Sequence, residues 1–240
     1  MAPKPDAADY ATVQAAAFGR LVRDGTYHAD FAHAPAPQRL FVRTFTGLLT
    51  KFSGRETLSV IDCGCGSGAW LELAIQCCRE HRFNVVPFGF DITPEMVSVA
   101  EQRLAPLNAQ LQTGDVLNAK SYEFLGAPVQ FDIVFTYDVV QQLPRDLQYE
   151  ACRTLLARVA PGGVLVVFDH DCDSRHGRKM AMRKFITRYF GIPLVPRYYC
   201  NARYPPMNRF AARLRRETGA ITEIHVSPET PKLALTVYPQ

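Results

Sequence analysis

The stretch Val60-Ile61-Asp62-Cys63-Gly64-Cys65-Gly66-Ser67-Gly68 decides the fold of this chain. The apolar run Leu58 to Ile61 leads into three glycines at alternate positions, and the residues after them, Ala69 to Cys78, suit a helix. Glycine allows a sharp turn and lets the backbone come into contact with a bound ligand. The stretch therefore predicts a buried strand, a ligand-binding turn and a helix in succession.

Asp62 distinguishes between two kinds of ligand for that turn. Gly64, Gly66 and Ala69 also satisfy the dinucleotide pattern G-x-G-x-x-A. In a dinucleotide site this position is apolar, because a carboxylate would repel the pyrophosphate bound just ahead of it. A sulfonium amino acid with a free ammonium group is attracted by a carboxylate instead. Asp62 therefore favours a ligand of the second kind.

Beyond the turn, strands and helices alternate as they do in a parallel sheet covered on both faces. Two closing strands are joined by so short a link that they suit an antiparallel pair. We expect an α/β fold with a doubly wound, mostly parallel seven-stranded sheet and an antiparallel closing strand. The expected strands are 58–61, 85–90, 109–113, 131–136, 164–168, 221–226 and 233–238, and the expected helices include 10–23, 37–52, 69–78, 145–159, 174–190 and 208–218, with Pro161-Gly162-Gly163 ending the helix 145–159.

Composition limits the class of protein. The 240 residues are 48% hydrophobic, which is enough for a substantial core, and no apolar run approaches the length of about 20 residues that spans a bilayer. The segment Met1 to Asp9 lacks a signal-peptide pattern. The seven cysteines are scattered, without a C-x-x-C pair, and we interpret His170, Cys172 and His176 as part of a polar loop. We expect a soluble, cytoplasmic protein without a metal.

Charge divides the chain unevenly. From Asp171 to Arg216 there are 12 Lys or Arg and 2 Asp, a local charge of +10, although the whole chain carries only +4. We expect four parts: an N-terminal helical cap (1–55), a Rossmann-like core (56–170), a basic and aromatic insertion that caps an acceptor site (171–206), and the closing helix and strands of the core (207–240).

Through the motif Asp62-x-Gly64-x-Gly66-x-Gly68, the chain resembles the class I S-adenosylmethionine-dependent methyltransferases. The resemblance continues in order through Asp91, Gly114-Asp115-Val116, Phe131-Asp132-Ile133-Val134 and Pro161-Gly162-Gly163, and it covers residues 57–169 and, more weakly, 219–239. It implies that S-adenosyl-L-methionine is the cofactor and S-adenosyl-L-homocysteine the product. It also implies that Asp91 holds the ribose hydroxyls and that the turn at Asp115 meets the adenine amino group.

The cofactor-binding residues expected from this resemblance lie at the ends of four strands, with one arginine added for the cofactor carboxylate. They are Asp62, Cys63, Gly64, Cys65, Gly66, Gly68, Asp91, Ile92, Met96, Gly114, Asp115, Val116, Tyr137, Asp138, Gln142 and Arg39. The chain departs from many relatives after the fourth strand, where Gln141 and Gln142 stand in place of a histidine pair. Glutamine cannot take a proton, so a general base must come from elsewhere or be absent.

Methyl transfer from a sulfonium is an in-line displacement, in which the protein mainly holds the nucleophile about 3 Å from the methyl carbon. His170, directly after the fifth strand, is the first candidate for a base, and Tyr137 and His28 are the others. Aromatic and basic residues are expected to contact the acceptor: Tyr27, His33, Tyr189, Arg197, Tyr198, Tyr199 and Tyr204.

Three functions remain open on the sequence. The first is O- or N-methylation of a small molecule, with an anionic or aromatic acceptor and an enclosed pocket beneath 171–206. The second is methylation of RNA or protein, which the basic stretch would suit, although there is no separate RNA-binding module. The third is a non-catalytic cofactor-binding protein. In addition, the basic helix at 176–190 could lie on a membrane surface, which would make the protein a peripheral one.

Overall fold

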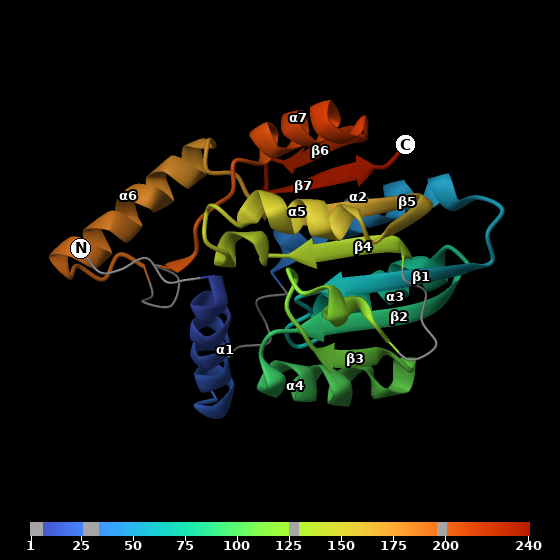
Figure 1. Cartoon of the computed structure of the whole chain (residues 1–240), viewed down its shortest axis with the longest axis horizontal. Coiled ribbons are helices and arrows are strands. Elements are labelled where there is room, and N and C mark those ends of the chain that lie inside the picture. The colour runs from blue at the N-terminus through green and yellow to red at the C-terminus, as the bar shows by residue number, and fades with distance from the viewer. Residues whose placement is uncertain (1–6, 26–33, 125–129, 196–200) are drawn as a thin grey trace.

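A twisted seven-stranded sheet runs through the protein in the order β3-β2-β1-β4-β5-β7-β6 (Figure 1). It is seen in a computed structural model that describes residues 7–25, 34–124, 130–195 and 201–240. The strands are β1 (Thr57–Cys63), β2 (Asn84–Asp91), β3 (Gln110–Thr113), β4 (Phe131–Tyr137), β5 (Val159–His170), β6 (Ile221–Ser227) and β7 (Thr230–Tyr238). Strands β1 to β5 pair in parallel, while β7 is antiparallel to both β5 and β6. The predicted fold class is confirmed.

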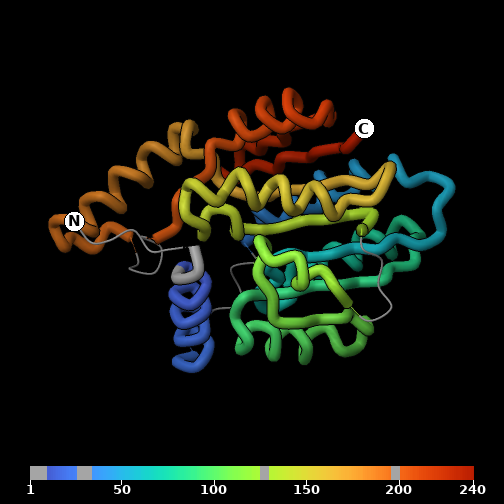
Figure 2. The backbone as a smooth tube through the Cα atoms, viewed as in Figure 1, coloured from blue at the N-terminus to red at the C-terminus, as the bar shows by residue number. Residues whose placement is uncertain are grey.

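Helices cover both faces of this sheet, as the smooth trace in Figure 2 also shows. They are α1 (Ala7–Arg23), α2 (Pro35–Leu49), α3 (Ala69–Glu80), α4 (Pro94–Leu104), α5 (Gln148–Leu156), α6 (Arg175–Phe190) and α7 (Met207–Thr218). Side chains of α2 and α3 pack on one face, and those of α5 and α7 pack on the other. None of the helices in the described ranges is long and apolar enough to cross a bilayer.

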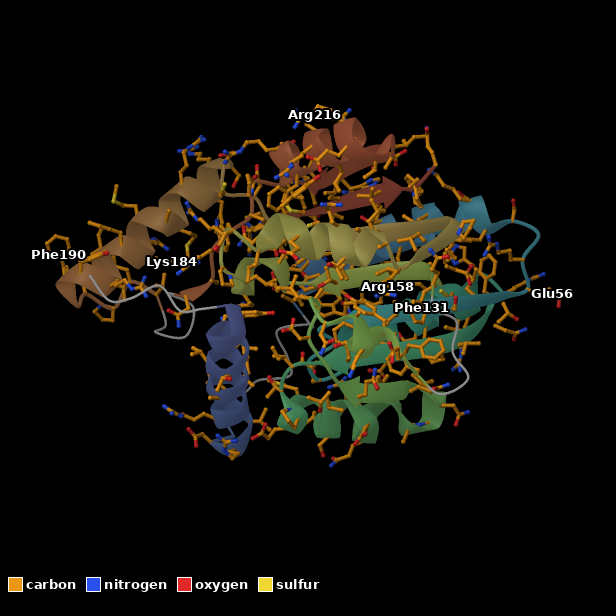
Figure 3. All side chains as sticks on the ribbon, viewed as in Figure 1. Glu56, Phe131, Arg158, Lys184, Phe190 and Arg216 are labelled. Atoms are coloured by element: carbon orange, nitrogen blue, oxygen red, sulfur yellow. The ribbon has the colours of Figure 1, made fainter. Side chains whose placement is uncertain are left out.

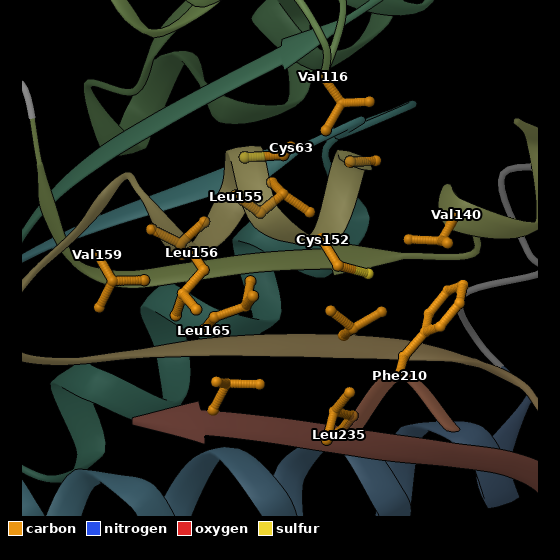
Figure 4. Packing of buried hydrophobic residues seen from close by; sticks show 14 of the residues in the cluster. Cys63, Val116, Val140, Cys152, Leu155, Leu156, Val159, Leu165, Phe210 and Leu235 are labelled. Atoms are coloured by element: carbon orange, nitrogen blue, oxygen red, sulfur yellow. The ribbon is translucent and has the colours of Figure 1, made fainter. Parts of the chain in front are cut away.

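Residues Val164 to Phe168 of β5 are all apolar because both faces of the strand are buried. Val164, Val166 and Phe168 belong to the cluster on the α2 side, whereas Leu165 and Val167 belong to the cluster on the α5 side. Successive side chains of a strand point to opposite faces, and both faces here are covered. Figure 4 shows the α5 side, where residues of the helix and of β5 interlock over the sheet.

Two expectations about boundaries require correction. Helix α2 is a core helix rather than part of a cap, because Phe41 stacks on Phe45 at 5.0 Å and on Phe168 at 4.8 Å. Helix α5 ends at Leu156, and the Pro161-Gly162-Gly163 turn lies inside β5, which begins at Val159. The register of β4 and β5 shifts there, so the turn forms a bulge in the sheet and does not end the helix.

Helix α6 begins as the sequence predicted. The Oγ of Ser174 accepts a hydrogen bond from the backbone N–H of Gly177 at 2.9 Å, which satisfies one of the free donors of the first turn. From there the helix projects away from the sheet, at the left of Figure 1. It is therefore anchored at its first turn and carries its last residues away from the core.

Candidate active site

A cavity of ≈ 700 Å³ lies at the carboxyl ends of the parallel strands. Open α/β sheets bind ligands at this edge, and the size is ordinary for a small-molecule pocket. Thirteen of the residues predicted for the site line it: Gly64, Cys65, Gly66, Asp91, Ile92, Met96, Gly114, Asp115, Val116, Tyr137, Asp138, Gln142 and His170. The strand ends therefore bring together residues that are more than a hundred positions apart in the sequence.

The glycine turn after β1 is held tightly against its neighbours. Gly64 has φ +88°, and a Cβ placed on it would lie 2.3 Å from the Cγ2 of Val139. The N–H groups of Gly64 and Cys65 both donate to the carbonyl of Phe90, at 2.8 and 2.9 Å. Only glycine meets both demands, a left-handed φ and contact with a neighbouring side chain. The turn thus presents bare backbone to the cavity.

Asp91, at the end of β2, ties the glycine turn to the next helix. Its Oδ2 accepts from the N–H of Gly66 at 2.9 Å, and its Oδ1 accepts from the N–H of Thr93 at the same distance. These bonds stabilise the ionised carboxylate, whereas burial raises its pKa. The carboxylate is thereby fixed at the cavity wall.

Asp62 is a buried carboxylate without a compensating partner. Its side chain is 1% exposed, and neither oxygen has a hydrogen-bond partner among the described residues. Burial, together with the nearby Asp91, raises its pKa well above the ordinary value. Asp62 does not itself line the cavity but lies at the strand end immediately before the lining glycines. A cation bound against the glycine turn would offset this charge, so the site fits a ligand with a free ammonium group.

Helix α1 closes one side of the cavity. The hydroxyl of Tyr10 donates to Oδ1 of Asp115 at 2.6 Å, and Nε2 of Gln14 donates to the carbonyl of Gln142 at 3.1 Å. Phe18, one turn beyond Gln14, also lines the cavity. The sequence predicted this helix as part of an N-terminal helical cap but named none of its residues for the site. The missed signal was a tyrosine and a glutamine four residues apart, on one face of the helix.

An aromatic and basic group lies where β4 ends. Tyr137 stacks on Trp70 with ring centroids 3.8 Å apart, and Nζ of Lys232 lies 4.8 Å from the Tyr137 centroid. Lys232 also forms an ion pair with Asp138, whose φ is +60°. Burial raises the pKa of Tyr137 above its usual value, so its hydroxyl stays protonated and acts as a donor. That hydroxyl is buried and has no partner among the described residues.

His170 ends β5 at the cavity wall, where it is 6% exposed. Its ring stacks on Tyr204 at 4.4 Å and on His176 at 5.2 Å. Burial, with Lys232 and His176 close by, lowers its pKa to about 2, so the imidazole is neutral at physiological pH. Nδ1 is buried and has no partner among the described residues. A neutral ring of this kind can accept a hydrogen bond from a bound molecule.

A buried carboxylate next to His170 fixes the loop after β4. Oδ1 of Asp169 accepts from the N–H of His170 at 2.7 Å, and Oδ2 accepts from the N–H of Gln141 at 2.9 Å. Burial, and the nearby Asp138, raise the pKa of Asp169 to about 8. Asp169 therefore holds the end of β5 and the start of the glutamine segment in one arrangement.

Several predicted site residues lie elsewhere. Arg39 is turned away: its Nε donates to Oε2 of Glu229 at 2.7 Å on the surface, and it does not line the cavity. The expectation that it binds the cofactor carboxylate is not retained. Tyr189 is 69% exposed on α6, and Tyr204 lies behind His170, so neither lines the cavity. Cys63 is the last residue of β1 and Gly68 is the N-cap of α3, so the two residues flank the turn and do not line the cavity. Six other residues predicted for the site fall outside the described residues: Tyr27, His28, His33, Arg197, Tyr198 and Tyr199.

Other lining residues were not predicted. Lys232 has no motif around it, and only the pairing of β7 with β5, which sets it opposite His170, brings it to the site. Met180 and Arg183 come from α6, and Leu194 and Val195 from the segment after it. Trp70 could have been predicted from the sequence, because it lies two residues after Gly68, the last glycine of the turn. The insertion does reach the cavity, through α6 and the residues just after it.

Comparison with known proteins agrees with this geometry. Residues 60–163 match the sequence model of a methyltransferase domain family. No curated protein matches the chain. The fold is similar to magnesium protoporphyrin IX methyltransferase from Synechocystis PCC 6803, solved with bound S-adenosylmethionine, at 15% identity over 100% of both chains with a TM-score of 0.63. It is also similar to the plantazolicin methyltransferase BpumL, at 13% identity over 96% of both chains with a TM-score of 0.59.

A third structure, an O-methyltransferase family protein from Burkholderia thailandensis, is 16% identical over 95% of this chain and 60% of that one, with a TM-score of 0.62. The sheet order, with a cavity at the strand ends, defines the class of fold: the Rossmann-like fold of the class I methyltransferases. Residues 60–163 match a methyltransferase domain, and the resemblance found in the sequence is confirmed.

Proposed function

We propose that the protein methylates a small molecule at oxygen or nitrogen, with the acceptor bound between the glycine turn and α6. The observation that carries this proposal is a single cavity of ≈ 700 Å³ that extends from Gly66 at the glycine turn to His170 and on to Met180 and Arg183 of α6. One end has the features of a cofactor site, and the other has a largely apolar wall. A concave, partly open cavity of this size suits a compact acceptor better than a folded protein or an RNA duplex.

At the cofactor end, the proposed roles follow from charge and backbone. Asp62 supplies negative charge for the ammonium group, and Asp91 accepts from the ribose hydroxyls with lone pairs that its two backbone bonds leave free. Asp115 faces the adenine amino group beside the hydroxyl of Tyr10. Trp70, stacked on Tyr137, forms an aromatic wall next to these groups.

At the acceptor end, the wall combines apolar side chains with cations. Met180, Leu194 and Val195 supply apolar surface, and Arg183 lies on the same wall. Within the described ranges no hydrogen bond or ion pair joins the Arg183 guanidinium to the protein. An acceptor with an apolar body and an anionic group would complement this wall. The substrates named for two similar proteins, magnesium protoporphyrin IX and plantazolicin, are compatible with an acceptor larger than a simple amine.

The chemistry needs alignment more than acid–base assistance. The cofactor, when bound, supplies an electrophilic methyl group on a sulfonium. The chain's part is to exclude water under α1 and to hold the acceptor atom in line. We propose that Nδ1 of His170, neutral and without a partner, accepts a hydrogen bond from the acceptor's O–H or N–H and orients its lone pair. The Tyr137 hydroxyl, protonated at neutral pH, donates to a ligand oxygen.

A labelling experiment tests this proposal. The protein is incubated with methyl-labelled S-adenosylmethionine and an extract of its native host, and small molecules, lipids, RNA and protein are then separated. We expect label in the small-molecule or lipid fraction. The variant Asp62→Asn should strongly reduce that label, because it weakens cofactor binding. His170→Gln should reduce turnover about 100-fold while cofactor affinity is retained. Label confined to RNA or protein would contradict the proposal.

A further inference from the structure

The outer end of α6 carries a cluster of exposed apolar side chains that the methyltransferase site does not use. We call this cluster the α6 tip; its members are Met182 (61% exposed), Phe185 (50%), Tyr189 (69%), Phe190 (68%), Ile192 (50%) and Leu194 (43%). The rings of Phe185 and Tyr189 lie 4.7 Å apart and form one surface with Phe190. Figure 3 shows Phe190 at the end of the helix that lies farthest from the sheet. A patch of this kind marks an interaction site.

The same helix is strongly basic. Helix α6 contains six Lys or Arg in 16 residues, and no Asp or Glu. Lys179 and Arg188 are exposed, and no hydrogen bond or ion pair within the described ranges engages their charges. The helix therefore offers an apolar end together with the unengaged cations Lys179 and Arg188. We propose that the α6 tip docks the protein on an anionic lipid bilayer, with the aromatic side chains in the headgroup region and the cations against lipid phosphates.

Charge and chemistry decide between this partner and two others. A second copy of the chain would bring two helices of six cations each together, and their repulsion opposes such a contact. RNA would neutralise the cations but would leave Met182, Ile192 and Leu194 without an apolar partner. A bilayer with anionic headgroups satisfies both parts of the surface at once. Leu194 belongs both to the tip and to the cavity wall, so docking would place the acceptor end of the cavity next to lipid.

The test is co-sedimentation of the full chain with vesicles of phosphatidylcholine mixed with phosphatidylglycerol, and with vesicles of phosphatidylcholine alone. We expect sedimentation with the anionic vesicles that weakens as salt is raised. The triple variant Phe185→Ser, Tyr189→Ser, Phe190→Ser should lower partitioning roughly 100-fold or more, because three apolar rings no longer enter the interface. The double variant Lys179→Gln, Arg188→Gln should lower it roughly 10-fold or more.

A control places comparable changes on two other elements, β6 and α7. Ile221→Ser and Val226→Ser remove exposed apolar side chains from β6, and Arg215→Gln and Arg216→Gln remove exposed cations from α7. This control should sediment like the unmodified protein. Circular dichroism and cofactor affinity verify folding, and the single variant Phe190→Ser replaces the triple variant if that one misfolds.

Three results would overturn the proposal. The first is that the unmodified protein stays in the supernatant with anionic vesicles. The second is that the α6 variants sediment as well as the control does. The third is a lipid-free dimer, measured by light scattering, that the triple variant dissociates; the tip would then be a contact between copies. None of these results depends on the acceptor, so failure here is distinct from failure of the proposed methylation.

Discussion

Replacement of Asp62 by asparagine separates the charge of this side chain from its shape. The carboxylate is 1% exposed, and neither oxygen has a hydrogen-bond partner among the described residues. Asparagine fills the same space without charge. An ammonium group near the glycine turn then loses an interaction with a desolvated charge, worth about 3 kcal/mol. We therefore expect Asp62→Asn to raise the dissociation constant for S-adenosylmethionine roughly 150-fold.

The same substitution should not weaken the ligand-free protein. An unpaired buried carboxylate costs free energy in the native state, and its neutral replacement removes that cost. We expect the free energy of unfolding of Asp62→Asn to equal or exceed that of the unmodified protein by about 1 kcal/mol. Isothermal titration calorimetry gives the affinity, and urea unfolding followed by circular dichroism gives the stability. Loss of affinity with retained stability is the signature of a carboxylate that serves the ligand.

Asp132→Asn is the matched control, because Asp132 lies at the opposite end of the sheet and has partners. Its Oδ2 accepts from the N–H and the Oγ of Ser59, both at 2.8 Å, and its Oδ1 pairs with Arg55. This variant should lose about 1.5–3 kcal/mol of unfolding free energy with unchanged affinity. An affinity of Asp62→Asn within about threefold of normal, a difference of only 0.7 kcal/mol, would refute the reasoning.

Three further predictions concern the histidine, the glycine turn and α1. The pKa of His170 is lowered from 6.5 to about 2, so protonation of the unfolded state makes the protein less stable as pH falls below 6.5. Between pH 7 and 5 the unmodified protein should lose about 2 kcal/mol of unfolding free energy, and His170→Gln should not lose it. Urea unfolding curves that shift equally with pH in both proteins would contradict this. Gly64→Ala should cost about 2–4 kcal/mol of unfolding free energy, because φ is +88° and a methyl group of Val139 lies where the Cβ would be. The control Gly47→Ala, in open space on α2, should raise the unfolding free energy by up to about 1 kcal/mol. Equal melting temperatures of the two variants would show that the turn is not tight. Tyr10→Phe removes the 2.6 Å bond to Asp115 and should speed cofactor dissociation by about threefold to tenfold in stopped-flow measurements, and an unchanged rate would mean that α1 does not retain the cofactor.

The fold and the glycine-turn end of the cavity were predictable because local rules determine them. The turn after β1 requires a left-handed backbone, which predicts a glycine such as Gly64. A strand buried on both faces requires an apolar run, which the segment Val164 to Phe168 supplies. Asp91 and Asp115 could be placed as well, since parallel strands end at one edge of the sheet. The course of β5 was predicted less well, because a bulge depends on the register of the neighbouring strand.

Tertiary structure alone decided the α6 end of the cavity and the ionisation of the groups around it. Lys232 reaches His170 through the pairing of β7 with β5, and no residue near it in sequence indicates this. The lowered pKa of His170 comes from burial and from charges that other elements bring to it. From the sequence we expected Arg39 to bind the cofactor carboxylate, yet its place on α2 directs its side chain toward Glu229. Sequence therefore determined what the backbone must do at each turn, whereas packing decided which side chains meet, because long-range contacts depend on how whole helices and strands are placed.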